Sequence, residues 1–270
     1  MNVGAGGRMT NDGALTRARN DGPTVAALGL LAMCVVTFDH EALGHGSACL
    51  LLGGHIRLLT SALFHCDVKS GWIDPAGPGM NLLMGAVALA VSRLVPARRA
   101  ALRLFLLLVA AFSFLWETGY VMHAMHRGEG DLYFFARFLL GEVTLWERWA
   151  AGALGLALYV STAWLVSDRL SALWPDARAA RAVARTAWLA ATVGAALAAL
   201  AYRVHDWGNL RDAVLEIGAA SFPLLFIPLR SARPVAPQPP VVIARRPAVI
   251  GLAAVVYLLF VATLGRGLPF

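Results

Sequence analysis

The run FDHEALGHG (38–46) places four ionisable side chains, Asp39, His40, Glu41 and His45, within seven residues of an apolar stretch. Ionisable groups inside an apolar stretch of membrane-spanning length are costly and usually functional. Imidazole and carboxylate groups bind divalent metals, and a glutamate beside a metal can accept a proton from water. The cluster therefore predicts a metal centre or a proton relay, and the competing interpretation is a polar cluster that pairs with neighbouring helices.

The spacing of the two histidines is unusual for a metal-binding helix. In His-Glu-x-x-His the histidines are four residues apart, so they differ by about 40° around the helix axis and share a face. His40 and His45 are five residues apart and would differ by about 140° on a regular helix. Two local structures can reconcile this spacing with a metal centre.

The first local structure is a single-turn π-bulge, which absorbs one residue and aligns positions that are five apart. Gly44 and Gly46 would ease such a distortion, and bulges of this kind favour functional sites. His40 and His45 would then bind the metal, and Glu41 would act as general base.

The second local structure is a regular helix in which Glu41 and His45, four residues apart, are the protein ligands. Ala42 then takes the position of the catalytic glutamate. Hydrolysis would need Asp39 or Glu117 as its base, or the site would be non-catalytic. The residues alone leave both alternatives open.

Two segments carry a family resemblance. HEALGHGSACLLLGGH (40–55) resembles the first core helix of the site-2-protease family of intramembrane zinc metallopeptidases, with its His-Glu motif, small residues and Gly-Gly turn. AGPGMNLLMGA (76–86) is similar to the Gly-Pro-x-x-Asn segment that opens a membrane helix in that family, with Gly77, Pro78 and Asn81 matching.

A third segment, HRGEGDLYFF (126–135), resembles the part of the family that supplies a third metal ligand, here Asp131. The family's Asn-x-x-Pro lead-in and the Gly after the Asp are absent from it. The resemblance implies that His40, His45 and Asp131 bind Zn²⁺ and that Glu41 is the general base.

The resemblance covers about residues 30–140. It implies that Gly77, Pro78 and Asn81 shape a substrate groove and that Glu117 supports a ligand histidine. The implied activity is hydrolysis of peptide bonds in a transmembrane or juxtamembrane segment of a protein substrate. The alternatives are a non-catalytic scaffold or metal-binding protein of the same fold, and a transporter that uses the ionisable cluster as a relay.

The elements that must position these residues are membrane helices. Hydrophobic residues make up 59% of the 270 and charged residues only 14%, far from an ordinary soluble domain. The composition predicts an all-α polytopic membrane protein of about six to seven transmembrane helices with a three-helix metallopeptidase-like core. The apolar runs lie at 24–52, 79–95, 101–125, 149–166, 186–202, 213–229 and 247–264.

The chain divides into a polar N-terminal tail (1–23), a core that carries the motifs (24–145) and additional transmembrane helices (146–270). Most of the 23 Lys and Arg residues lie in the tail and in alternate loops, which predicts a cytoplasmic N-terminus in a multi-pass protein of the cell membrane, in bacteria the inner membrane. The site then lies towards the non-cytoplasmic side. The net charge of +7 is interpreted as the result of basic loops that face the cytoplasm. Nucleic acid is therefore not expected as a partner.

The remaining features receive simpler interpretations. The three cysteines include no C-x-x-C pair, so neither a zinc ribbon nor a disulfide framework is predicted. The loop 53–78 is predicted to be a hairpin or an interfacial lid, and 131–141 a short interfacial helix. Isolated polar residues outside the main cluster are interpreted as solvated or interfacial, and these are His65, Cys66, Asp67, His123 and His126.

Overall fold

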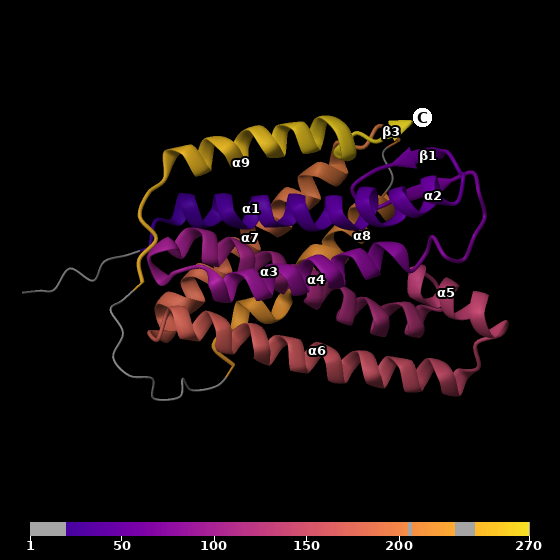
Figure 1. The fold of residues 1–270 in the computed structure, drawn as a ribbon, viewed down its shortest axis with the longest axis horizontal. Helices are drawn as coiled ribbons and strands as arrows, with labels where there is room; N and C mark the ends of the chain where they lie inside the picture. Colours follow the sequence, from indigo (N-terminus) through magenta and orange to yellow (C-terminus); the bar gives the residue numbers. More distant parts are fainter. Residues whose placement is uncertain (1–19, 205–206, 230–240, 270) are drawn as a thin grey trace, which may run out of the picture.

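The computed structural model describes residues 20–204, 207–229 and 241–269 of the chain. Most of these residues are helical, and the long helices lie side by side along the longest axis of the molecule (Figure 1). A β-hairpin and the short helix α5 gather at one end, opposite the end where α1 begins (Figure 1). The predicted helical class is confirmed.

The first helix is continuous from Gly22 to Leu51 and changes its winding on the way. It consists of α1 (Gly22–Phe38), the π-helical segment η1 (Asp39–Gly46) and α2 (Ser47–Leu51). The hairpin β1 (Ile56–Leu59) and β2 (Phe64–Cys66) follows. The later elements are α3 (Ala76–Leu94), η2 (Ala97–Arg99), α4 (Ala100–Arg127), α5 (Asp131–Leu140), α6 (Leu145–Leu173), α7 (Ala177–Leu200), α8 (Trp207–Ala213), η3 (Val214–Ala219), η4 (Phe222–Phe226), α9 (Pro247–Phe260), η5 (Val261–Gly265) and β3 (Leu268–Pro269).

Within the described residues, five helices are long and apolar enough to cross a membrane, which supports a multi-pass membrane protein. They are Gly22–Leu51, Ala100–Arg127, Leu145–Leu173, Ala177–Leu200 and Pro247–Gly265. The predicted run 79–95 forms a helix, α3, that is not among these five. The number of candidate membrane-spanning helices among the described residues is therefore five, lower than the six to seven predicted.

The prediction of a span at 213–229 is wrong. This run is divided among the end of α8, the π-helical η3 and the 3₁₀-helical η4. Pro223 and Pro228 have no backbone N–H and cannot continue the helical hydrogen-bond pattern. The run is apolar because part of it is buried against other helices: η3 and η4 both pack on α7.

Two helices begin earlier than their apolar runs, because polar residues cap them. Thr144 accepts a hydrogen bond from the backbone of Glu147, whose side chain accepts one in return from the backbone of Thr144; this capping box starts α6. The side chain of Asp176 accepts from the backbone of Arg178 and starts α7.

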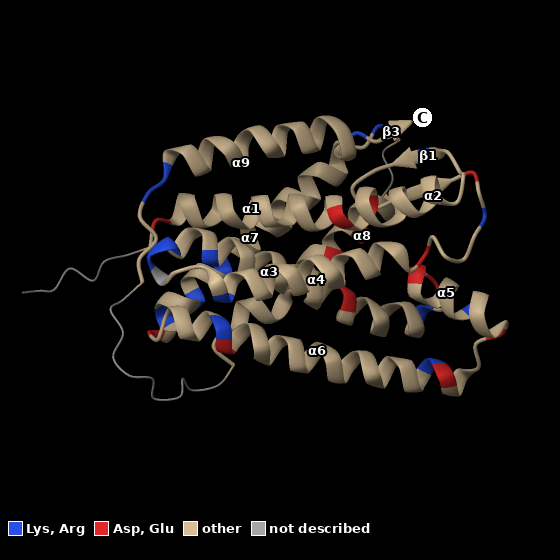
Figure 2. Ribbon diagram, in the orientation of Figure 1, with Lys and Arg blue, Asp and Glu red and all other residues tan. Residues whose placement is uncertain are grey.

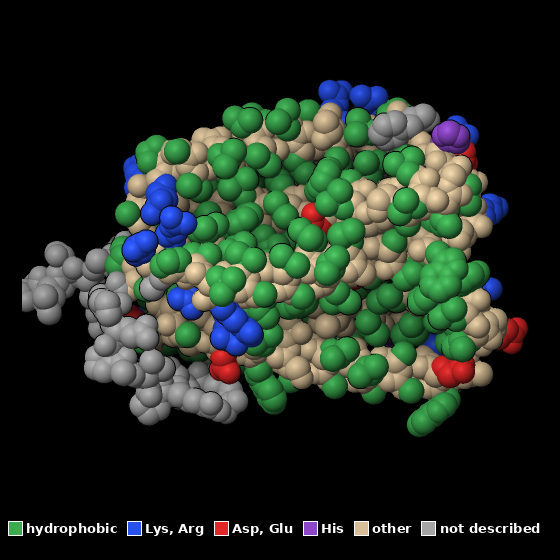
Figure 3. Space-filling view, viewed as in Figure 1, with side chains coloured by type: hydrophobic (Ala, Val, Ile, Leu, Met, Phe, Trp, Pro, Cys, Tyr) green, Lys and Arg blue, Asp and Glu red, His purple; other side chains and the backbone are tan. Residues whose placement is uncertain are grey.

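The centre of the bundle is formed by α1 and α4, which pack against each other and against α3, α6, α7 and α9. Among the largest buried side chains are Trp116 and Phe112 of α4 and Met33 of α1. The outer helices instead expose apolar side chains, for example Leu252 and Leu258 of α9. Figure 3 shows hydrophobic side chains spread over the visible face, as expected where lipid tails replace water.

Charged residues are concentrated near the ends of the bundle. Figure 2 shows Lys and Arg gathered where α1 and α9 begin and where α3 meets α4. Red acidic residues also lie inside the bundle, near the far half of the first helix and near α5 (Figure 2). Their position places the ionisable cluster between the arginine-rich end and the hairpin end.

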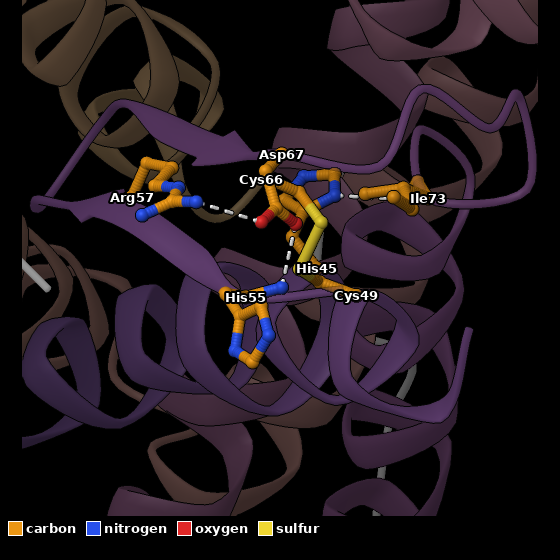
Figure 4. Close-up of a disulfide and its surroundings, with 7 residues drawn as sticks. All are labelled: His45, Cys49, His55, Arg57, Cys66, Asp67 and Ile73. Atoms are coloured by element: carbon orange, nitrogen blue, oxygen red, sulfur yellow. Dashed lines mark hydrogen bonds and ion pairs between the residues drawn. A yellow bond between two sulfur atoms is a disulfide. The ribbon is translucent and has the colours of Figure 1, made fainter. Parts of the chain in front are cut away.

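The hairpin and β3 form a three-stranded antiparallel sheet with the order β2-β1-β3, so β1 is the middle strand. A disulfide joins Cys49 at the end of the first helix to Cys66 in β2 (Figure 4). The expectation that the cysteines form no disulfide framework is therefore wrong for Cys49 and Cys66, and only Cys34 is a free thiol in the described chain. Asp67 accepts hydrogen bonds from the backbone of His55 and the guanidinium of Arg57 (Figure 4), so it stabilises the hairpin.

Candidate metal centre

Three side chains from two distant parts of the chain meet in the hairpin half of the bundle. His40 and His45 come from η1, and Asp131 is the first residue of α5. The Nε2 atoms of the two histidines are 3.2 Å apart. The Asp131 Oδ2 atom lies 3.5 Å from His40 Nε2 and 3.4 Å from His45 Nε2. These are the three side chains of the described residues that converge closely enough to hold a metal ion.

The π-helical segment explains how histidines five apart reach one point. Each turn of η1 holds one extra residue, so positions i and i+5 align. The first of the two alternatives, a π-bulge that aims His40 and His45 together, is confirmed. The regular helix with Glu41 and His45 as the ligand pair is wrong.

Close packing of α3 accompanies this distortion. A Cβ atom at Gly44 would lie 2.5 Å from the Cα of Gly77 and 2.6 Å from the carbonyl oxygen of Ala76. Such distances are far below ordinary contact, so α3 can approach η1 only because residue 44 has no side chain. Gly46 makes only ordinary contacts. Gly44 thus serves the approach of α3 to the π-helical segment.

Both imidazole rings are fixed through their other nitrogen. The Nδ1 of His45 lies 2.8 Å from the carbonyl oxygen of Ile73, which can only accept, so Nδ1 carries the proton. The Nδ1 of His40 lies 3.0 Å from Glu117 Oε1, and the same oxygen accepts a 2.7 Å hydrogen bond from Asn81. The amide nitrogen of Asn81 also lies 3.2 Å from His40 Nδ1. If the Glu117 carboxylate accepts the Nδ1–H of His40 as the Ile73 carbonyl accepts that of His45, both Nε2 atoms present lone pairs.

Aromatic side chains hold the planes of the rings. The ring of His40 stacks on Trp116 with centroids 4.5 Å apart and planes 10° from parallel. The ring of His45 stacks on Phe64 of the hairpin with centroids 5.6 Å apart. The two Nε2 atoms therefore have little freedom to turn away from each other.

The geometry of the three donor atoms fits a tetrahedral metal. Ligand atoms about 2.0–2.1 Å from a tetrahedral ion lie about 3.3–3.4 Å from one another, and the three observed separations are 3.2, 3.4 and 3.5 Å. Direct ion pairs between imidazolium and carboxylate are shorter, about 2.7–2.9 Å. Two lone pairs and a carboxylate that face each other at these distances form a possible site for a cation.

The space for that cation is kept clear by Gly77. A Cβ atom at this position would lie 2.3 Å from His45 Nε2 and 2.7 Å from His40 Nε2, so any side chain here would occupy the point where the donor atoms converge. Pro78 follows in the first turn of α3, where a missing N–H leaves no helical hydrogen bond unmade. Asn81, fully buried, lies behind His40 and bonds Glu117.

Glu41, next to the first ligand, is buried. Its Oε2 atom is fully buried and accepts no hydrogen bond from any described residue. It lines the same cavity as His40, His45 and Asp131. Glu41 thus borders the cavity and has a carboxylate oxygen without a hydrogen-bond partner among the described residues.

The cavity has a volume of about 1390 Å³ and lies between the hairpin loop, α4, α5 and the η3 segment. Asp131 is the most exposed of the three candidate ligands, with 26% of its side chain accessible. Although burial opposes ionisation, hydrogen bonds with His40 and His45 hold the pKa of Asp131 below its ordinary value. Asp74, on the loop before α3, also lines the cavity. Its pKa is raised to about 6, mainly because the carboxyl group is buried and also because the negative charge of Asp131 is near.

The other sequence candidates lie at the edges of the site. His65 is exposed on the hairpin and, with His123, lines the cavity wall away from the three donor atoms. The residues alone did not lead to Glu216 of η3, which lies in the cavity wall. The sequence feature that could have indicated Glu216 is its position as an acidic residue inside the apolar run 213–229.

No family model matches this chain, and searches of curated proteins and of solved structures give no significant match.

Proposed function

We propose that this protein is an intramembrane zinc metallopeptidase that hydrolyses peptide bonds in membrane-embedded or juxtamembrane segments of protein substrates. The observation that carries the proposal is the convergence of His40 Nε2, His45 Nε2 and Asp131 Oδ2 at 3.2–3.5 Å. Beside this metal centre, Glu41 has an oxygen with no hydrogen-bond partner among the described residues.

Two imidazoles and one carboxylate form a donor set that suits zinc and leaves the fourth tetrahedral position open, as in catalytic zinc sites. When bound, the metal would polarise a substrate carbonyl and lower the pKa of water in the open position to about 7. Glu117 and Ile73 would keep the two ligand histidines in the tautomer that presents Nε2.

Glu41 would perform the proton transfers. Its free oxygen would accept a proton from the attacking water and deliver that proton to the nitrogen of the leaving amine. A general base contributes about 10²–10⁴-fold to such a reaction. The burial of Glu41 keeps bulk water from competing for that oxygen.

The cavity suits a peptide rather than a small metabolite. Its volume of about 1390 Å³ exceeds the range of about 300–1,000 Å³ that is usual for small-ligand pockets. A helical substrate hides its carbonyls in its own hydrogen bonds, so the substrate segment must unwind before it enters. Residues 24–145 hold all the catalytic and metal-binding residues of this proposal.

The membrane arrangement follows from three features. The helix α3 exposes Leu82, Leu83 and Val87, and we place it in the membrane as a short sixth helix beside α1 and α4. The arginine-rich end of the bundle (Figure 2) would face the cytoplasm. The disulfide Cys49–Cys66 lies at the hairpin end, and disulfides persist outside the reducing cytosol. The site would thus open towards the non-cytoplasmic side of a bacterial inner membrane.

The experiment is a comparison of zinc content and proteolysis for purified protein in lipid nanodiscs. The wild type should hold about one zinc ion and cleave a membrane substrate. Glu41→Gln should keep the zinc and lose cleavage, whereas His45→Ala should lose both. Folded wild-type protein without zinc would contradict the metal centre. Zinc-loaded protein that cleaves no membrane peptide would favour the non-catalytic metal-binding alternative.

A further inference from the structure

A second π-helical segment, η3 (Val214–Ala219), forms part of the cavity wall. It is anchored by hydrogen bonds from outside its own helix. The indole N–H of Trp188 donates to the carbonyl of Gly218 at 2.9 Å, and the hydroxyl of Tyr159 donates to the carbonyl of Ala220 at 2.7 Å. The segment therefore holds its side chains in a fixed position relative to α6 and α7.

Glu216 is the acidic residue of this segment, and it lines the same cavity as Glu41. Its Oε2 atom is fully buried and accepts no hydrogen bond from any described residue. Glu216 does not belong to the close group formed by His40, His45 and Asp131, so it is not placed to be a metal ligand. A buried carboxylate without a partner is costly, and this cost calls for a function.

The charges around Glu216 are mostly negative. Burial and the nearby Glu41 raise its pKa well above the ordinary value, and Asp131 and Asp212 add to the repulsion. Asp212, one turn earlier, already pairs with Arg211 at 2.8 Å. No ion pair joins Glu216 to a Lys or Arg of the described chain.

The bases that line the cavity lie at its edge. Lys69, Arg137 and Arg211 are exposed, and Arg211 already pairs with Asp212, whereas the Oε2 atom of Glu216 is buried. A cation brought beside Glu216 would favour ionisation of its carboxyl group, which burial and the neighbouring carboxylates disfavour. Arginine is suited to such a site, because its planar guanidinium donates two parallel hydrogen bonds to one carboxylate.

We propose that Glu216 is a specificity-determining residue that binds a cationic side chain of the substrate, an arginine or a lysine close to the bond to be cleaved. The proposal rests on the proposed peptidase function only in assuming that the bound molecule is a peptide. It assigns the substrate class: an apolar membrane segment that carries a basic residue.

The test measures binding in a protein that cannot cleave. Zinc-loaded Glu41→Gln protein in nanodiscs is titrated with two fluorescent apolar peptides, identical except that one carries arginine where the other carries citrulline. Citrulline keeps the shape of arginine and removes its charge. The arginine peptide should bind at least about tenfold more tightly, because an unpaired buried carboxylate discriminates strongly for charge.

The added substitution Glu216→Gln should bring the two affinities to within about twofold of each other. Glu142→Gln is the matched control, because Glu142 also lines the cavity but is exposed; the arginine preference should survive there. Glu216→Ala is a second variant with the same expectation as Glu216→Gln. Equal binding of both peptides to the Glu41→Gln protein, or a preference that survives both Glu216 substitutions, overturns the proposal.

The result is separable from the fate of the proposed function. Preferential binding of the arginine peptide that depends on Glu216, in a protein that never cleaves when Glu41 is present, would reject the peptidase and keep this inference. Cleavage of both peptides with equal efficiency and equal affinity would keep the peptidase and reject this inference.

Discussion

Substitution of Gly77 by alanine tests the metal centre most directly. A Cβ atom at this position would lie 2.3 Å from His45 Nε2 and 2.7 Å from His40 Nε2. Zinc bonds to imidazole nitrogen are about 2.0–2.1 Å long. The new methyl group would therefore take almost the place of the metal ion.

The magnitude follows from these distances. Ordinary contacts of such atoms are about 3.5 Å, so the ring of His45 would have to retreat by about 1 Å. Metal–ligand distances tolerate only about 0.2 Å, so coordination by this ring would be lost. Since loss of a supporting residue alone costs about 10–100-fold in metal affinity, we expect zinc affinity to fall by more than about 100-fold. The metal-free protein should lose about 1–3 kcal/mol of stability through overpacking.

The assay is zinc affinity by chelator competition, with circular dichroism and thermal unfolding to establish that the variant folds. Gly79→Ala is the matched control. Gly79 lies two residues further along α3, and a Cβ atom there meets nothing within 4 Å, so zinc affinity should stay at the wild-type value. Wild-type affinity in Gly77→Ala would refute the site geometry, and equal losses in both variants would indicate a general disturbance of α3.

Three further predictions address the supports of the site. Glu117→Gln should weaken zinc binding about 10–100-fold, because the fixed tautomer of His40 depends on this carboxylate; unchanged affinity would contradict that role, and Glu142→Gln is the control. Cys66→Ser, which opens the Cys49–Cys66 link of 17 residues, should lower the free energy of unfolding by about 3 kcal/mol, measured by denaturation with and without reductant; reductant that still destabilises the variant as much as the wild type would point to another cause. Asp74→Asn should raise the melting temperature of the metal-free protein at pH 8 but not near pH 4, because a folded-state pKa of about 6, above the ordinary 3.8, makes ionisation of Asp74 unfavourable to folding only at the higher pH; a difference that persists unchanged at pH 4 would exclude titration of Asp74 as its source.

The disulfide illustrates a contact that spacing alone does not reveal. Cys49 and Cys66 are separated by a turn and a β-strand, and no short motif connects them. Their sulfur atoms meet because the hairpin folds back over the end of the first helix (Figure 4). The same fold-back brings Phe64 onto the ring of His45. The disulfide and the position of this histidine ring therefore both depend on the packing of the hairpin against the first helix.

The disulfide was a contact that the sequence did not predict, whereas the run 213–229 is a membrane span that the sequence predicted and the structure does not contain. Its hydropathy predicts a span, but Pro223 and Pro228 lack the backbone N–H groups that one continuous helix needs. What the hydropathy reported was burial within the bundle, where Ile217 and Leu224 are almost fully covered. Apolar composition alone does not separate burial in lipid from burial in protein.

The amino-acid sequence by itself determined the membrane class, through its long apolar runs, and the chemical types of the site, through the rare ionisable residues within those runs. The pairing of Asp131 with His40 and His45 was implied only by the family resemblance. The sequence did not decide whether histidines five residues apart face together, because a regular helix and a π-helical turn are both open to the same residues. The tertiary structure decided this: Gly44 lets α3 press against the helix, and Glu117 and Ile73 hold the two rings. A π-helical turn is rare as a local structure, and here it is packed against α3 and its two histidine rings are held by α4 and the loop before α3.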